Sequence, residues 1–305
     1  MTRFVLARLA STALMFLAIT LFVFVAFSRL GRSYAYRPHG TLPGQYVHYL
    51  WRLVGHGDLG YSSVTREAVT TQLLRAAPVT LSLVVGGLLV WLLIALPLGL
   101  LSALRPRRPL DRASSVFVFA GLSLHPVWLG LMLSWLFGRY LHVLPAAGYC
   151  SMGNVSTGCE GVGRWASHLL LPWITFGVVN AALFTTMVRA LVLEELGSDY
   201  VRTAIAKGAG GFRIVRAHVL QNVMLPLLTM AGLLVGTSLA GVIFVESAFD
   251  LPGLGGILRQ AAVRHDLPVI AGSVVFLGVA IALLNLAVDL AYAAFDPRLR
   301  GMLRA

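Results

Sequence analysis

Long apolar runs separated by shorter polar segments set the pattern of this chain. Six of the runs contain the roughly 20 mostly apolar residues that a helix needs to cross a membrane once. In chain order they are Leu9–Ser28, Val79–Leu101, Ser114–Phe137, His168–Arg189, Leu227–Glu246 and Val269–Ala291. The pattern therefore predicts an all-α integral membrane protein with six transmembrane helices, forming a single domain over residues 1–305.

The composition supports this interpretation. Hydrophobic residues make up 58% of the 305 residues and charged residues only 12%, whereas a soluble domain carries about 25% charged residues. The first run follows Arg3 and Arg8, as a signal peptide would. Its length and the sequence Phe27-Ser28-Arg29-Leu30 at its end favour a retained membrane anchor.

The distribution of basic residues predicts the orientation. The net charge of +12 would suit a nucleic-acid partner, but more than half of the 24 basic residues fall on segments that face inward if the amino terminus is inside. Cytoplasmic loops carry such an excess. We therefore expect both termini in the cytoplasm, outer loops over residues 29–78 and 138–168, an inner loop over residues 190–225, and no nucleic-acid partner.

The two cysteines fall together in the second outer loop. Eight residues separate Cys150 from Cys159, and an extracytoplasmic compartment permits disulfides. A disulfide is the expectation, with two free thiols or a metal site as the alternatives. Two cysteines are too few for a four-ligand zinc site, so we expect no metal.

Two short helices are expected in the first outer loop. The alternation of apolar and polar residues over Gln45–Val54 suits a surface helix, and Val64–Leu74 could form a second one along the membrane interface. Turn residues in the sequence Gly55-His-Gly-Asp-Leu-Gly60 separate the two.

Catalytic motifs are missing from the sequence. It contains no Gly-x4-Gly-Lys-Ser/Thr phosphate loop, no His-Glu-x-x-His and no Gly-x-Ser-x-Gly. The chain is therefore predicted to be a non-catalytic membrane subunit without a cofactor of its own.

A small number of polar and small residues inside the spans are candidates for a functional site. Glu246 and Asp289 are ionisable groups near span ends; each is either a helix-end or packing residue or a substrate or proton group. Gly232, Gly236 and Ala240 recur every four residues and either allow close helix packing or leave room for a translocation path.

The inner loop holds the most informative segment. Ser198–Lys207 reads as a short helix, because Ser198 suits the N-cap, Asp199 suits the positive helix end and Gly208 can end it. One face of this helix would carry Val201, Ala204, Ile205 and Gly208. Such a short, capped helix indicates docking to a partner; the alternative is a connector resting on the lipid surface.

Several motifs in this loop match a known family. They are Asp199-Tyr200-Val201-Arg202-Thr203-Ala204, Ala206-Lys207-Gly208, Arg213, His218, Asn222 and Leu225-Pro226. The segment resembles the cytoplasmic "EAA" loop of permeases of binding-protein-dependent ABC importers, in the version of the oligopeptide, dipeptide and nickel group. Matches elsewhere follow the family's order along the chain: Gly57-Asp58-Leu59-Gly60, Leu144-Pro145-x-x-Gly148, Phe249-x-x-Pro252-Gly253-Leu254-Gly255 and Asp296-Pro297-Arg298.

The resemblance implies a type I importer permease in the cytoplasmic membrane. This chain would pair with a second permease subunit, two ATPase subunits that hold ATP and Mg²⁺, and an extracytoplasmic binding protein that delivers di- or oligopeptides. The segment Ser198–Gly208 would be the coupling helix on the ATPase, with contacts from Asp199, Tyr200, Val201, Arg202, Thr203, Ala204, Lys207 and Gly208. The insert between the cysteines looks additional to the family pattern.

Other functions remain open at this point. An importer of the same class could carry nickel, glutathione or another small solute. A stand-alone secondary transporter would need coupling carboxylates or discontinuous helices in matching halves, and a membrane-embedded enzyme would need a paired catalytic constellation; neither pattern is evident in the sequence.

Overall fold

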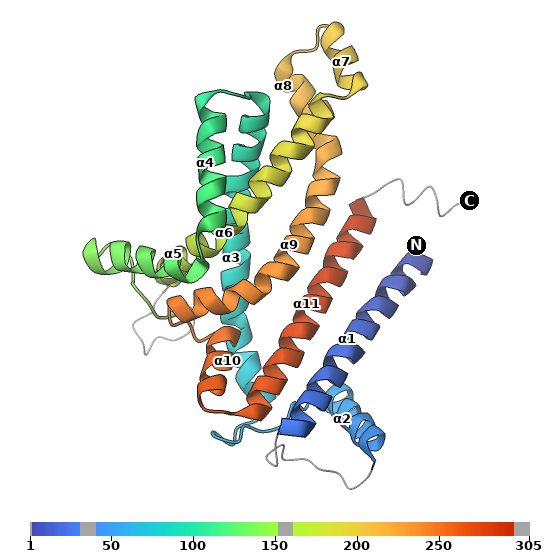
Figure 1. The fold of residues 1–305 in the computed structure, drawn as a ribbon, viewed down its shortest axis with the longest axis vertical. Coiled ribbons are helices and arrows are strands. Elements are labelled where there is room, and N and C mark those ends of the chain that lie inside the picture. The colour runs from blue at the N-terminus through green and yellow to red at the C-terminus, as the bar shows by residue number, and fades with distance from the viewer. Residues whose placement is uncertain (1, 31–40, 152–160, 296–305) are drawn as a thin grey trace. The chain divides into compact units, whose positions relative to one another are not determined.

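The computed structural model describes residues 2–30, 41–151 and 161–295 (Figure 1). In this part of the chain all regular elements are helices, joined by turns and loops, and one isolated bridge links Tyr61 and Ala68. The chain divides into two compact units. The first comprises residues 1–82 and 250–287, and the second comprises residues 83–249 and 288–305.

The first unit is built on three long helices and two short ones. They are α1 (Thr2–Leu30), α2 (Leu42–His56), the start of α3 (Val69–Leu104), α10 (Leu254–Val263) and α11 (Leu267–Phe295). Their buried apolar side chains form one core that includes Val23, Leu73 and Val275. A Cβ atom at Gly272 would lie 2.5 Å from Cγ1 of Val69, so the glycine lets α11 approach α3 closely.

The outer loop of this unit confirms one predicted helix and corrects another. The helix α2 covers the predicted Gln45–Val54 and ends at Gly57, which has a φ of 60°. The predicted helix over Val64–Leu74 is wrong, because Val64 lies in a turn and α3 begins only at Val69. The hydroxyl of Ser62 accepts hydrogen bonds from the backbone N–H groups of Val64 and Thr65, at 3.2 and 2.8 Å. Such local bonds compete with helix formation.

A buried carboxylate fastens this turn to the end of α10. Asp266 is 3% exposed and accepts hydrogen bonds from the hydroxyl of Ser62 and from the backbone N–H and hydroxyl of Ser63, the last two at 3.1 and 3.0 Å. Burial alone would raise the pKa of Asp266, but these hydrogen bonds outweigh it and hold the pKa below its usual value. The ionised form is therefore part of the folded structure.

Replacing Asp266 with alanine should lower the thermal midpoint of the detergent-solubilised protein at neutral pH. The change leaves Ser62 and Ser63 without their acceptor, which costs about 1–3 kcal/mol. Because folding lowers the pKa of Asp266, its stabilising effect is present above about pH 4 and is lost as the pH falls further. The gap between wild type and Asp266→Ala should shrink in melts below pH 4. An equal gap at pH 7 and pH 3 would contradict this account.

The second unit is organised around one long helix. It contains the rest of α3, then α4 (Pro109–Ser123), α5 (Pro126–Leu133), the π-helix η1 (Ser134–Tyr140), α6 (Val162–Leu196), α7 (Asp199–Ala206), α8 (Gly211–Ile214), the π-helix η3 (Val215–Val219) and α9 (Leu220–Ala248). The helix α6 packs against α4, α5 and α9. A Cβ atom at Gly177 of α6 would lie 2.7 Å from Cγ1 of Val90, so α3 and α6 also approach closely.

Five of the described helices are long and apolar enough to cross a membrane. They are α1, α3, α6, α9 and α11, and these helices contain five of the six predicted spans. The predicted third span, Ser114–Phe137, is not one straight helix: α4 and the segment Pro126–Tyr140 meet at an angle of 105°. The chain reaches six spans if this bent pair counts as one.

Proline explains the bend. Pro126 lacks a backbone N–H and disfavours helical geometry in the residue before it. His125 accordingly has a ψ of 136°, and its side chain accepts a hydrogen bond from the N–H of Val127 at 3.3 Å. The helix α4 therefore ends, and α5 starts afresh in a new direction.

Candidate functional site

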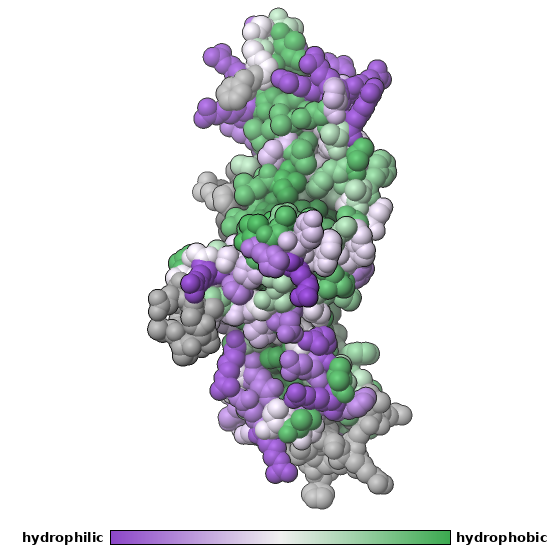
Figure 2. Space-filling model, turned by 90° about the vertical axis from the view of Figure 1, so that its left-hand side faces the viewer, coloured by the Kyte–Doolittle hydropathy of each residue, from purple (hydrophilic) through white to green (hydrophobic). Residues whose placement is uncertain are grey.

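The polar segment between α6 and α9 is almost wholly helical. The helix α6 continues to Leu196, the short helix α7 follows one turn later, and α8 and η3 lead into α9 at Leu220. Figure 2 shows hydrophilic side chains gathered at the α7–α8 end of the second unit and apolar surface beside it. The segment thus extends a polar helical tip beyond apolar spans.

The helix α7 has the predicted limits, although its N-terminus is capped differently. Ser198 stands at the N-cap position with a ψ of 151°, but its hydroxyl donates to the carbonyl of Glu195 at 2.6 Å rather than capping α7. At the other end, Gly208 has a φ of +82°, a conformation that side-chain-bearing residues rarely adopt. Gly208 is therefore needed for the turn after α7, and the chain reverses there.

The predicted apolar face of α7 is divided into a covered and an uncovered part. Val201 is fully buried within its own chain. Its side chain is therefore not exposed to a partner, contrary to the prediction. Ile205, one turn later, is 57% exposed, and Ala204 is half-buried. Val201 therefore anchors the helix, while Ile205 is its uncovered apolar side chain.

Charged residues flank this uncovered turn. Asp199 and Arg202 are exposed and lie 3.9 Å apart across one turn of α7, and Thr203 and Lys207 are exposed as well. An exposed ion pair of this kind contributes little to stability. These charges are therefore available to a partner surface.

Three polar side chains fasten α7 to the ends of the two neighbouring long helices. The hydroxyl of Tyr200 donates to the carboxylate of Glu195 at the end of α6. The side-chain amide of Asn222, in the first turn of α9, donates to Oε1 of Glu195 and to the Tyr200 hydroxyl, both at 2.9 Å. We call Glu195, Tyr200 and Asn222 the α7 clamp. It joins three helices at one point.

The clamp keeps its tyrosine protonated. Partial burial and the neighbouring Glu195 carboxylate raise the pKa of Tyr200 above its usual value, against smaller opposing effects of hydrogen bonds from Asn222 and Ser198. The phenol therefore remains a hydrogen-bond donor at any physiological pH.

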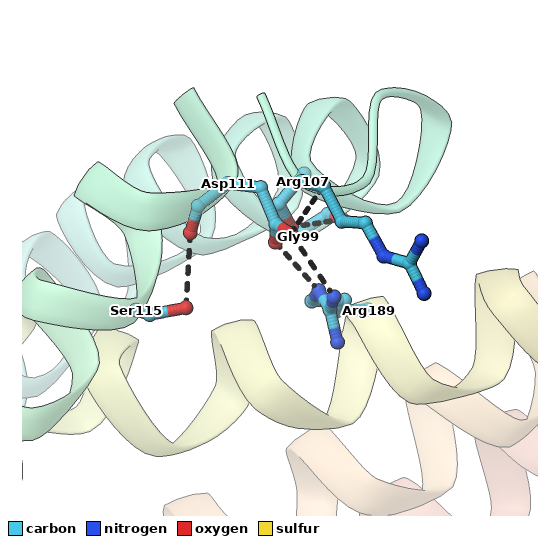
Figure 3. A network of polar contacts seen from close by, with 6 residues as sticks. Gly99, Arg107, Asp111, Ser115 and Arg189 are labelled. Carbon is cyan, nitrogen blue, oxygen red and sulfur yellow. Dashed lines mark hydrogen bonds and ion pairs between the residues drawn. The ribbon is translucent and has the colours of Figure 1, made fainter. Parts of the chain in front are cut away.

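A second polar contact ties α4 to α6 in the same unit. The carboxylate of Asp111 accepts from Nε and a terminal nitrogen of Arg189, at 3.0 and 3.3 Å, and from the backbone N–H of Arg107 at 2.9 Å (Figure 3). Arg107 has a φ of 64°, so the carboxylate stabilises a tight turn between α3 and α4. The sequence analysis missed Asp111. Its place in the first helical turn, two residues after Pro109, was the available signal.

The Asp111–Arg189 pair should show strong coupling in a double-mutant cycle. Asp111→Asn and Arg189→Gln should each lower the thermal midpoint, because each leaves one charge without its partner. The double variant should lose less than the sum of the two single losses. Strict additivity of the three midpoints would show that the pair contributes nothing as a pair.

Comparison with known proteins identifies the family. A model of the family described as "binding-protein-dependent transport system inner membrane component" matches residues 95–301. The chain belongs to this family. The dipeptide transport system permease DppB of Escherichia coli K12 is 36% identical over 273 residues, covering 84% of this chain and 80% of that protein.

Other relatives agree. The probable D,D-dipeptide transport system permease DdpB of E. coli K12 is 36% identical over 259 residues, covering 80% of this chain and 76% of DdpB. The di/tripeptide transport system permease DppB of Pseudomonas aeruginosa is 35% identical over 270 residues, covering 84% and 80%. The chain is thus a multi-pass inner membrane component of a bacterial transport system, and the resemblance inferred from the sequence is confirmed.

The remaining predicted site residues of this permease lie outside the inner loop. Gly232 and Gly236 are buried in α9, whereas Ala240 is exposed. Glu246 is fully buried near the end of α9. Asp289 belongs to α11, but its side chain lies outside the described residues.

The predicted disulfide stays a prediction. Cys150 is 1% exposed, while Cys159 lies outside the described residues. The motif Asp296-Pro297-Arg298 also lies outside them. Among the residues that the structure does describe, no three His, Cys, Asp or Glu side chains form a group that could hold a metal ion.

Proposed function

We propose that this chain is one of two permease subunits of an ATP-driven importer that takes di- and oligopeptides from an extracytoplasmic binding protein. The cargo is inferred from relatives named for dipeptide and di/tripeptide transport. Nickel, glutathione and other small solutes have no comparable support. In this arrangement both termini and the loop 190–225 lie in the cytoplasm.

The exposed last turn of α7 carries the proposal. Ile205 offers an uncovered apolar contact, and Arg202 and Lys207 stand beside it with exposed charges. A central apolar side chain with a charged rim is the usual anatomy of a protein interface. The partner would be a cytoplasmic ATPase, because transport against a gradient needs an energy source and this chain has no phosphate loop. ATP and Mg²⁺ would bind in two such ATPase subunits.

The α7 clamp suggests how force would pass from the ATPases into the membrane. When ATP closes the ATPase pair, a helix seated on them must move with them. Because Glu195 and Asn222 tie Tyr200 to both α6 and α9, that movement would shift the ends of both spans together. The spans would then open the path to the binding protein, and hydrolysis would reset them.

Purification of the tagged chain from its host membrane in mild detergent tests this proposal. We expect mass spectrometry to find a second permease subunit and ATPases with phosphate loops in the same complex. Vesicles containing that complex and the binding protein should accumulate dipeptide only when ATP is supplied on the α7 side. A stable complex without any ATPase, or uptake that ignores ATP, would support a secondary transporter instead.

A further inference from the structure

The helix α2 exposes an apolar face that the part of the chain described by the structure leaves uncovered. Val47, Trp51 and Val54 follow one another at helical spacing and are 64%, 61% and 71% exposed. None of these three side chains is charged. A water-facing helix would place polar residues at such positions, so another apolar phase must meet this face.

The opposite face of α2 fixes the helix against α1. Tyr46 and Tyr49 pack their rings against Phe24, with centroids 5.5 and 5.9 Å apart, and Leu53 packs on the core of the first unit. The Tyr46 hydroxyl donates to the carbonyl of Leu17 at 3.2 Å. Figure 1 shows α2 lying beside the end of α1 that is remote from the amino terminus. The helix is thus held alongside a membrane span.

The contact with α1 gives the depth of α2. The apolar part of α1 is Arg8–Phe27, whose 20 residues span about 30 Å, the thickness of a hydrocarbon core. The Thr20 hydroxyl lies 3.0 Å from the Tyr46 hydroxyl. Thr20 is seven residues before Phe27, so it lies about 10 Å inside the Phe27 end of this apolar run. A tyrosine side chain is shorter than this depth, so the side chain of Tyr46 can reach Thr20 only if the backbone of α2 lies no farther out than the end of the apolar run. The backbone of α2 at Tyr46 therefore lies at the level of the lipid boundary.

The charge on α2 is turned away from the apolar face. Arg52 forms an ion pair with Asp58 in the loop after the helix. Burial alone would raise the pKa of Asp58, but hydrogen bonds from Arg52 and from the backbone N–H of Gly60 outweigh it and lower that pKa. The pair stays charged at neutral pH, and Arg52 is held on the loop side of the helix.

We propose that α2 is an interfacial helix that inserts Val47, Trp51 and Val54 into the outer boundary of the bilayer. Interfacial helices bury their apolar face in the boundary between headgroups and acyl chains, and the contact between Tyr46 and Thr20 places α2 at that level. Tryptophan and tyrosine gather at this level in membrane proteins because their rings combine apolar and polar parts. The inserted helix would fix the height and tilt of α1 in the bilayer.

A soluble partner such as the binding protein is the competing occupant of this face. It would approach from the aqueous side, whereas Tyr46 holds α2 beside the apolar run of α1 and not beyond it. The proposal concerns membrane seating and does not depend on the cargo or on the ATPase contact.

Fluorescence quenching in vesicles tests the insertion. The complete transporter is reconstituted in phosphatidylethanolamine and phosphatidylglycerol whose acyl chains carry bromine near the headgroup, and the Trp51→Phe variant is measured in parallel. Subtracting the two spectra isolates Trp51 from the other five tryptophans. We expect this difference signal to be quenched by the brominated lipid and protected from iodide in the buffer. Quenching by iodide without quenching by brominated lipid would overturn the proposal.

Photo-crosslinking provides a second measurement that needs no change of Trp51. Benzoylphenylalanine placed at Val54 in host membranes should yield a phospholipid adduct of the chain. The same group at Leu53, one position round the helix and packed on the core, should react only within the chain. An adduct between position 54 and the binding protein or the second permease subunit would show that a protein covers this face.

Discussion

The variant Ile205→Asp is expected to abolish peptide uptake while the chain still inserts and accumulates in the membrane. Ile205 is exposed, so the substitution should change the stability of the isolated chain by less than about 0.5 kcal/mol. In the assembled importer it would bury an unpaired carboxylate at the centre of the ATPase contact. Loss of a central interface contact costs about 2 kcal/mol or more, so the ATPases should be retained at least tenfold more weakly.

Two companion variants make this test specific. Ile205→Val keeps an apolar side chain and should transport at close to the wild-type rate, whereas the half-buried Ala204→Asp should fail like Ile205→Asp. Gly208→Asp is less informative, because its φ of +82° would strain any side chain there. Normal ATPase co-purification and uptake by Ile205→Asp would remove the α7 contact from the mechanism.

The second large effect is expected from the α7 clamp. Asn222→Ala removes the amide that donates to both Glu195 and Tyr200, and Tyr200→Phe removes the hydroxyl that joins α7 to α6. Both variants should still bind the ATPases, because neither alters Ile205 or Lys207. ATP hydrolysis should continue, but the peptide delivered per ATP should fall severalfold, since movement of α7 would no longer reach both spans.

The measurement is the ratio of peptide taken up to ATP hydrolysed in vesicles. Thr186→Ala is a suitable control, because its hydroxyl donates to the backbone carbonyl of Leu183 in the same helix, α6, and lies outside the α7 contact and the clamp. An unchanged ratio in both clamp variants, with wild-type uptake, would show that the clamp is only a structural detail of the loop.

Most of the helical architecture could be predicted from hydropathy. A span needs a long apolar run whatever it packs against, so five of the six predicted spans recur in the structure. The bend in the third span could not be predicted, because the apolar composition is continuous across the break in geometry. Pro126 was visible in the sequence, but proline is tolerated inside many membrane helices, as Pro172 of α6 and Pro226 of α9 demonstrate. Whether a proline kinks a helix slightly or bends it by 105°, as between α4 and α5, depends on how the flanking helices pack.

The inner loop shows the same division between local and long-range information. The end of α7 follows from Gly208, whose positive φ acts within one turn, whereas Ser198 occupies the N-cap position without its hydroxyl capping the helix. Helical spacing alone could not show that Val201 is covered and Ile205 is not, because that depends on how the neighbouring helices fold back. The α7 clamp joins Glu195 to Asn222 across 27 positions, and nothing in either residue's local sequence predicts the pairing.

Photo-crosslinking at α7 tests the central claim most directly. Benzoylphenylalanine is placed at Ile205 or, as the matched buried control, at Val201, and the assembled transporter is irradiated in host membranes. The account predicts that position 205 captures an ATPase with a phosphate loop, whereas position 201 reacts only within its own chain. Capture of lipid at position 205, with no ATPase adduct, would instead make α7 a connector resting on the membrane and would contradict the account.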